Sequence, residues 1–279
     1  MQGQFKRFYN LEEFVKSKEN AITSLSIWLI NKKLDYEGVK TISSNLKEYK
    51  DITKLDLSIS GNKIDDKGAY AFGQALSYFG NLTYLSLYLN DNNIGDRGIT
   101  KISIGLSNSS MITNLILSLG DNQINDDGAY AVGVALRKFK HLEDLQLWLN
   151  GNQFGDRGIS GIVTGLNNCT QLKILKAGFG DNKITDEGYL KLDQCLAGLV
   201  NLQYLLYGFF SGSEKMLKSR DILNCKNVRI LTLQFEPKLL KSEKIQHKIK
   251  ALKILRLVVL EVHQYEDYED DGIDYPYFE

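Results

Sequence analysis

Six glycines recur at a fixed spacing of thirty residues along the 279-residue chain: Gly38, Gly68, Gly98, Gly128, Gly158 and Gly188. A strict period of this length is typical of an array in which one supersecondary unit is repeated and each copy stacks on the next. Such an array presents a long surface in place of a single deep pocket, so the period bears on function as well as on fold.

The copy at residues 52–81 shows what each unit contains. Apolar residues alternate with polar or small ones through Lys54–Ile59, which predicts a strand with one buried face. Apolar residues then follow helical spacing through Gly68–Leu76, and Asp66 is placed to cap the start of that helix. Because strand, turn and helix fit in thirty residues, consecutive strands should lie parallel and be joined by right-handed crossovers.

The same pattern predicts six strands, each followed by a helix that begins near the repeat glycine. These strands are Ser24–Leu29, Lys54–Ile59, Tyr84–Leu89, Asn114–Leu119, Asp144–Leu149 and Ile174–Phe179. An aspartate also recurs two residues before the glycine, and we expect it to cap the helix of its own copy: Asp66, Asp96, Asp126, Asp156 and Asp186.

An asparagine follows five of these strands, at Asn62, Asn92, Asn122, Asn152 and Asn182. The string L-x-x-L-x-L, then N-x-I and a helix, resembles leucine-rich repeats of the ribonuclease-inhibitor-like class. The phrases NLTYLSLYLNDNNIGDRG and NKITDEG are similar to the thirty-residue variant expanded in ciliates. The resemblance implies an α/β right-handed solenoid, a horseshoe with a concave parallel β-sheet and convex helices. It also implies that the asparagine ladder satisfies backbone groups inside the turns.

Four segments follow from where the pattern holds and where it fails. Residues 1–21 have helical spacing without a strand of their own, which predicts an N-terminal helical cap, and residues 22–201 hold six repeats. Residues 202–260 are degenerate and basic, with strands expected near Leu202, Val228 and Leu252, and we favour a terminal cap over a binding module there. Residues 261–279 form an acidic, tyrosine-rich tail.

The last two segments differ sharply in charge. Residues 210–256 contain twelve Lys or Arg and four acidic residues, whereas residues 261–279 contain eight acidic residues and no Lys or Arg. The basic region is therefore a candidate surface for nucleic acid or another acidic partner. The tail either shields that region or extends freely into solvent.

The outward residues of each strand are expected on the concave sheet, since helices pack farther apart than strands and so occupy the outside of the curve. One column of these residues alternates large aromatic with small side chains, and the alternation follows a sixty-residue superperiod that a duplicated pair of repeats would also explain. We interpret this face as a partner-binding surface. Its candidate residues are Trp28, Tyr88, Trp148, Tyr84, Asp56, Ser86, Asn90, Asp144, Gln146, Asn150, Lys176 and Tyr204.

The sequence offers little to a catalytic interpretation. Its three histidines are scattered, and there is no P-loop, kinase signature, nucleophile–base motif or Cys/His metal spacing. A calcium site at Asp91, Asp121 and Asp181 remains an alternative, although no twelve-residue loop closed by glutamate is present. We therefore predict no enzyme activity, no cofactor and no metal.

The remaining features bear on location. The three cysteines are interpreted as buried free thiols of a reducing compartment. No stretch has the apolar length of a membrane span, and the first residues lack a signal-peptide core. We expect a cytoplasmic scaffold that binds another protein, within a cytoskeletal or ciliary assembly, with nucleic acid as the less favoured partner.

Overall fold

The computed structural model describes residues 4–17, 22–209, 225, 227–235 and 259–264. Within them, strands and helices alternate along a single sheet whose order β1 to β10 is the order of the sequence, with every neighbouring pair parallel. The strands are β1 Gln4–Phe8, β2 Ile22–Trp28, β3 Lys54–Ser58, β4 Tyr84–Tyr88, β5 Asn114–Ser118, β6 Asp144–Trp148, β7 Ile174–Gly178, β8 Tyr204–Phe209, β9 Ile230–Phe235 and β10 Val259–Gln264. The helices are α1 Leu11–Lys16, α2 Tyr36–Leu46, α3 Asp66–Leu76, α4 Asp96–Leu106, α5 Asp126–Leu136, α6 Asp156–Leu166 and α7 Asp186–Gly198.

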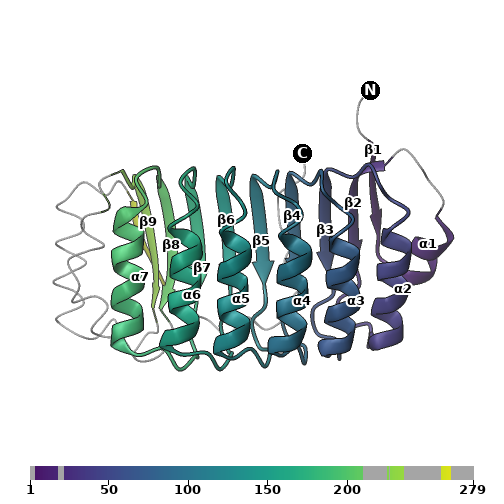
Figure 1. Cartoon of the computed structure of the whole chain (residues 1–279), viewed down its shortest axis with the longest axis horizontal. Helices are drawn as coiled ribbons and strands as arrows, with labels where there is room; N and C mark the ends of the chain where they lie inside the picture. Colours follow the sequence, from purple (N-terminus) through teal and green to yellow (C-terminus); the bar gives the residue numbers. More distant parts are fainter. Residues whose placement is uncertain (1–3, 18–21, 210–224, 226, 236–258, 265–279) are drawn as a thin grey trace.

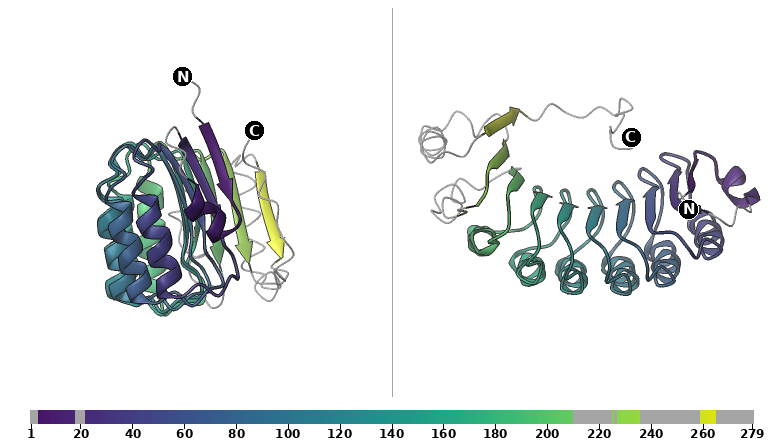
Figure 2. Two further views of the ribbon diagram at one scale, coloured as in Figure 1. Left: turned by 90° about the vertical axis from the view of Figure 1, so that its right-hand side faces the viewer. Right: turned by 90° about the horizontal axis from the view of Figure 1, so that it is seen from above.

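The helices stand in one row that covers one face of the sheet (Figure 1). Seen from above, the array bends into an arch with the strands inside and the helices outside (Figure 2). The expected α/β solenoid with a concave parallel sheet and convex helices is therefore confirmed, as is the position of each of the six expected strands to within two residues at either end.

The core lies between the sheet and the helix row. In-register leucines such as Leu55, Leu85, Leu115 and Leu145 face the helices from successive strands and are fully buried. Since each apolar row continues from one repeat to the next, the interior is one continuous cluster, and each copy depends on its neighbours for burial.

Asparagine side chains tie the turns of adjacent repeats together. Asn122 donates from Nδ2 to the carbonyl oxygens of Leu89, Leu119 and Gly120, at 3.0–3.1 Å. Its Oδ1 accepts the backbone N–H of Ile94 at 3.0 Å. Leu89 and Ile94 belong to the preceding repeat, so one amide satisfies backbone groups of two copies.

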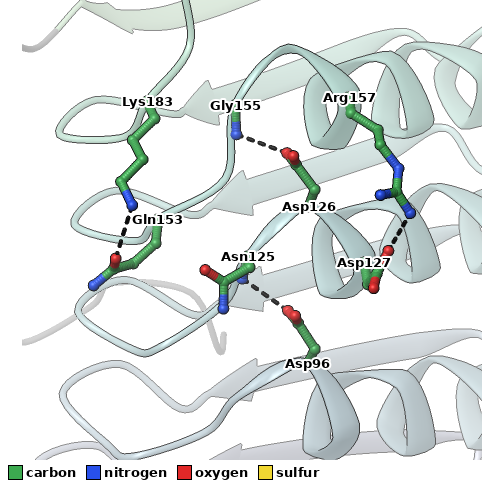
Figure 3. Close-up of a pocket in the computed structure, with 8 residues that line it drawn as sticks. All are labelled: Asp96, Asn125, Asp126, Asp127, Gln153, Gly155, Arg157 and Lys183. Atoms are coloured by element: carbon green, nitrogen blue, oxygen red, sulfur yellow. Dashed lines mark hydrogen bonds and ion pairs between the residues drawn. The ribbon is translucent and has the colours of Figure 1, made fainter.

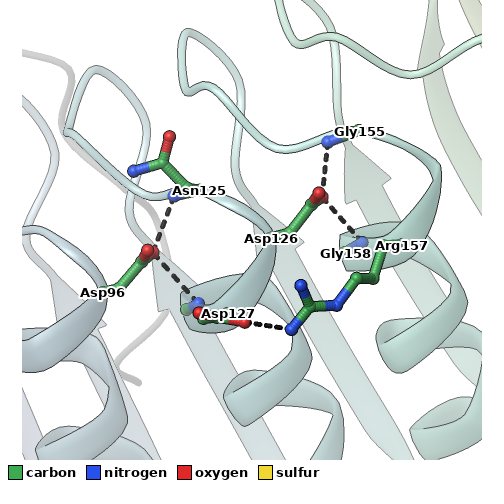
Figure 4. Close-up of polar contacts among 8 residues, drawn as sticks. Asp96, Asn125, Asp126, Asp127, Gly155, Arg157 and Gly158 are labelled. Carbon is green, nitrogen blue, oxygen red and sulfur yellow. Dashed lines mark hydrogen bonds and ion pairs between the residues drawn. The ribbon is translucent and has the colours of Figure 1, made fainter.

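The aspartates before the repeat glycines act differently from our expectation. Asp66, Asp96, Asp126 and Asp156 accept N–H groups at the start of the helix of the following repeat and not of their own helix. Asp126, for example, accepts from the N–H groups of Gly155 and Gly158 at 2.7 and 2.8 Å (Figure 4). Asp66 and Asp96 make the corresponding bonds to α4 and α5. Because the residues immediately before α4, α5 and α6 supply no side-chain cap, these helices depend on the neighbouring copy.

Helices α2 and α3, at the start of the array, are capped by aspartates of their own copies. Tyr36 occupies in the first copy the position that Asp66 occupies in the second, so α3 receives no carboxylate from the copy before it. Asp65 caps α3 from its own sequence instead, through the N–H groups of Lys67 and Gly68. Asp35 caps α2 in the same way, through Gly38.

Glycines bring the helices together in pairs. A Cβ placed on Gly73 of α3 would lie 2.4 Å from the carbonyl oxygen of Lys101 in α4, and one on Gly133 of α5 would lie 2.1 Å from that of Gly161 in α6. Only glycine permits backbones to approach this closely. The pairs α3–α4 and α5–α6 repeat every sixty residues, which gives the superperiod of the sequence a structural counterpart.

Two expectations about the ends are corrected. Residues 4–8, which we assigned to a purely helical cap, form β1 and extend the sheet by pairing with β2. The last described strand, β10, ends at Gln264 and so runs into the segment that we assigned to the tail. The strand expected near Leu252 begins outside the described residues. Most of the basic region 210–256, and the tail from residue 265, lie outside the described residues.

Candidate functional site

The aromatic column lies on the concave side, as the sequence predicts. Trp28 pairs in register with Ser58, Ser58 with Tyr88, Ser118 with Trp148, and Trp148 with Gly178. The three aromatic side chains are half-buried, whereas the small residues between them are buried. At one point the reason is visible: a Cβ on Gly178 would lie 2.9 Å from the Trp148 ring. The small neighbour gives the indole room to lie against the sheet.

Trp28 is already occupied by the chain itself. Its Nε1 donates to Oδ2 of Asp56 at 2.7 Å, and the Arg7 guanidinium lies 4.7 Å from its ring centroid. Tyr9 packs edge-on against it, with centroids 6.1 Å apart. The N-terminal strand therefore covers this end of the column, which the sequence analysis could not anticipate without β1.

Two residues proposed to contact a partner are buried instead. Asp56 is only 4% exposed, and its carboxylate accepts from Trp28 and from Ser26 Oγ. Ser86, in the same column on β4, is 1% exposed. Both side chains lie on the concave side of their strands, but larger neighbours cover them, so neither reaches a partner directly.

Strand β6 carries the open part of the face. Asp144, Gln146 and Trp148 project from it on the concave side and are half-buried. Among the residues that the structure describes, no side-chain hydrogen bond, ion pair or ring contact engages any of the three. We call these three residues the β6 stripe; it combines a carboxylate, an amide and an indole along about 13 Å of strand.

The position of Asp144 is unfavourable for the charged form of its carboxyl group. Its Oδ1 is buried and has no hydrogen-bond partner among the described residues. Burial raises the pKa of this carboxyl above its ordinary value, and the nearby Lys176 opposes that shift without cancelling it. A buried acceptor left unpaired is unfavourable. A hydrogen-bond donor from a partner would therefore stabilise the carboxylate of Asp144.

The other predicted residues surround the stripe. Tyr84 and Tyr88 lie on β4, which β5 separates from the stripe. Burial, followed by Asp56 and Tyr88, raises the pKa of Tyr84 far above its ordinary value. Asn90 accepts from the hydroxyls of Ser60 and Ser118, and Asn150 accepts from the N–H of Gly180, each at 3.0 Å.

On the C-terminal side of the stripe, a cation and an aromatic ring meet. The Lys176 ammonium on β7 lies 5.9 Å from the ring centroid of Tyr204 on β8. Both side chains are half-buried on the concave side of the sheet. Lys176 pairs in register with Gln146, which places this cation beside the middle of the β6 stripe.

Carboxylates line the edge of the sheet where the strands end. Asp91, Asp121 and Asp181 are exposed and adopt left-handed backbone conformations with φ of 53–54°. Burial, then Asp91 and then Asp181 raise the pKa of Asp121. We call these three residues the acidic rim. The described residues contain no cluster of His, Cys, Asp and Glu side chains arranged to hold a metal ion.

A shallow polar groove of about 340 Å³ lies at the N-termini of helices α5 and α6 (Figure 3). Its lining is largely committed to the fold. Asp96 and Asp126 cap helices, Arg157 pairs with Asp127, and Lys183 donates to Gln153. The groove is therefore a product of the capping between repeats.

The cysteines and helices add two observations. Cys169, Cys195 and Cys225 are buried and form no disulfide, as expected, and burial raises the pKa values of Cys169 and Cys195 to about 11 and about 12. No helix in the described part of the chain is both long and apolar enough to cross a membrane.

Comparison with family models agrees with the repeat architecture. A family model described as Leucine Rich repeat matches residues 53–73, 81–103 and 113–133, which are the segments of β3–α3, β4–α4 and β5–α5. A solved structure titled "Leiomodin-1 Actin-Binding Site 2 (ABS2)" is 14% identical, with a TM-score of 0.41 over 68% of this chain and 93% of that chain. No curated protein matches the sequence. Three of the repeats thus match the leucine-rich repeat model, and the parallel sheet with its row of helices has the fold of a leucine-rich-repeat solenoid.

Proposed function

We propose that this protein is a non-catalytic interaction scaffold that binds another protein on its concave sheet. The observation that supports this proposal is the β6 stripe: Asp144, Gln146 and Trp148 stand together at the middle of the arch without side-chain partners among the described residues. Elsewhere on the same face, polar groups such as Asp56 and Asn90 are used within the fold. Open aromatic and hydrogen-bonding groups next to each other are typical of interface centres.

The scaffold interpretation extends to location and to repeat type. We place the protein in the cytoplasm, within a cytoskeletal or ciliary assembly, and three buried cysteines that form no disulfide accord with a reducing compartment. The ribonuclease-inhibitor-like and ciliate character of the repeats remains a prediction from the sequence. The alternative of nucleic-acid binding through residues 210–256 concerns residues that mostly lie outside the described part of the chain.

Selection from a random peptide library displayed on phage tests the proposal. Peptides enriched on the wild-type protein are measured against a stripe variant, Asp144→Ala, Gln146→Ala and Trp148→Ala. A convex control carries Tyr70→Ala and Ile104→Ala, two exposed positions on α3 and α4. We expect the stripe variant to lose at least tenfold in affinity and the control to bind normally. Equal binding by both variants would refute a concave site at β6.

A further inference from the structure

The two tryptophans of the concave column have the same place in their repeats but different surroundings. Around Trp28, the chain supplies an arginine: Arg7 lies over the ring at 4.7 Å and donates from Nε to Ser26 Oγ at 3.3 Å. Trp148 stands four repeats further on, and no ring, cation or acceptor among the described residues engages it. The contact between Arg7 of the N-terminal strand and Trp28 thus shows that the solvent-facing side of the aromatic column binds a planar cation.

The edge beyond Trp148 is shaped to favour such a cation. Gly151, three residues further on and therefore within about 10 Å, has φ +64° and no side chain. The Asp121 carboxylate occupies the vacated space, since a Cβ on Gly151 would lie 2.1 Å from its Oδ1. Asp181 follows the next strand, β7, so carboxylates of the acidic rim stand on both sides of the exit of β6.

The opposite end of the stripe also calls for a donor. Within the described part of the chain, the buried Oδ1 of Asp144 has no hydrogen-bond partner, and Lys176 acts on this carboxyl through space without forming an ion pair with it. Lys176 stands beside Gln146 in the register, at the middle of the stripe. Its charge disfavours a cation there and leaves the two ends, Asp144 and Trp148, as the places where positive groups bind.

We propose that the β6 stripe recognises a basic protein segment, which places an arginine on Trp148 beneath the acidic rim and a second cationic side chain at Asp144. The inference rests on the proposed function and adds the chemistry of the partner. In an extended segment that runs along β6, the two cations are four residues apart, because the stripe itself spans four residues of strand. Guanidinium suits the Trp148 end, since it stacks on indole and hydrogen-bonds to carboxylates at its edge.

Tryptophan fluorescence gives a direct test. The chain has two tryptophans, so Trp28→Phe leaves Trp148 as the sole reporter. Three synthetic twelve-residue peptides are titrated at low salt: one with two arginines four residues apart, one with citrulline at both positions, and one with glutamate. We expect the arginine peptide to change the Trp148 emission at sub-millimolar concentration. The citrulline peptide should bind at least tenfold more weakly, and the glutamate peptide should not bind.

Variants locate the contacts. Asp121→Asn with Asp181→Asn, and separately Asp144→Asn, should each weaken the arginine peptide about tenfold. Asp51→Asn, an exposed aspartate after α2, is the matched control and should change nothing. Circular dichroism of each variant confirms the fold before titration.

The outcomes separate this inference from the proposed function. Equal binding of the arginine and citrulline peptides, or tighter binding of the glutamate peptide, would overturn the basic partner while leaving the concave site intact. Silence of Trp148 toward all three peptides would also overturn it, if library-selected peptides still change the emission of Trp148. Silence toward the selected peptides as well would remove the proposed function itself.

Discussion

Asn122 and Asp144 are both polar residues of the repeat, but their surroundings predict opposite effects on the stability of the fold. The amide of Asn122 makes hydrogen bonds to backbone groups of two repeats. The carboxylate of Asp144 has a buried oxygen to which no group in the described ranges donates a hydrogen bond. The first residue is therefore expected to stabilise the fold, and the second to serve a partner at some cost in stability.

Replacing Asn122 by alanine leaves three carbonyl groups and one N–H without this partner. We expect the free energy of unfolding to fall by about 2–4 kcal/mol, because buried backbone groups become unsatisfied. Chemical denaturation measures the change, and hydrogen exchange should show the damage in both adjacent repeats. Asn93→Ala, an exposed asparagine one repeat earlier, is the control. Equal stability of the two variants would contradict the ladder.

Asp144→Asn should behave in the opposite way. The raised pKa of Asp144 means that the folded state disfavours its charged form. The folded state therefore holds its proton to higher pH than the unfolded state, and stability falls as the pH rises from about 4 through the raised pKa. We expect the variant to be more stable than the wild type at neutral pH, with the difference vanishing below pH 4. A variant that is less stable at neutral pH would show that Asp144 supports the fold.

At the scale of the element, a helix in this solenoid is completed by its neighbour. Our error about the aspartate row has a physical reason: the carboxylate and the amides that it caps are 29 to 32 residues apart, so a single copy of the repeat cannot reveal the contact. For the same reason, the sequence of one copy could not predict the contacts of Trp28 with Arg7, Tyr9 and Asp56. The period predicted that strands of successive copies pair, but it did not predict these side-chain contacts between copies.

Removal of the Asp126 carboxylate should loosen α6 more than its own helix α5. In Asp126→Ala, the N–H groups of Gly155 and Gly158 lose their acceptor, which should cost about 1–2 kcal/mol. Hydrogen exchange should accelerate at Gly158 while the first turn of α5 keeps its protection. The neighbouring Asp127→Ala removes only an exposed ion pair with Arg157 and should have little effect. Faster exchange confined to α5 would mean that the cap acts within its own copy.

The paired helices make a second prediction at this scale. In Gly73→Ala, the added methyl group meets the backbone of α4 at 2.4 Å, so the two helices must separate. We expect a loss of about 1–3 kcal/mol in spite of alanine's better helix propensity. Gly80→Ala, where nothing lies within 4 Å of the new methyl group, should be neutral. Thermal unfolding of the two variants decides the matter, and equal melting temperatures would rule out the close pairing.

At the scale of the whole molecule, the fold was readable from the sequence because every strand repeats the same alternation at a fixed period. The sign of the curvature followed as well, since strands pack more closely than helices. The candidate binding site was predicted from the sequence only in part. The columns identified which residues face the concave side, but burial of Asp56 and Ser86 depends on the size of their neighbours. The open state of the β6 stripe depends on which side chains find partners in the next repeat.

Site-specific photo-crosslinking tests the concave site most directly. A benzophenone side chain is introduced at Gln146, in the middle of the β6 stripe, and in a second protein at Gln74, which is exposed on convex helix α3. Each protein is irradiated with a library-selected peptide that binds the wild type. We predict that position 146 crosslinks to the peptide and position 74 does not. Crosslinking from position 74, with none from position 146, would place the binding surface on the helices and contradict the concave site.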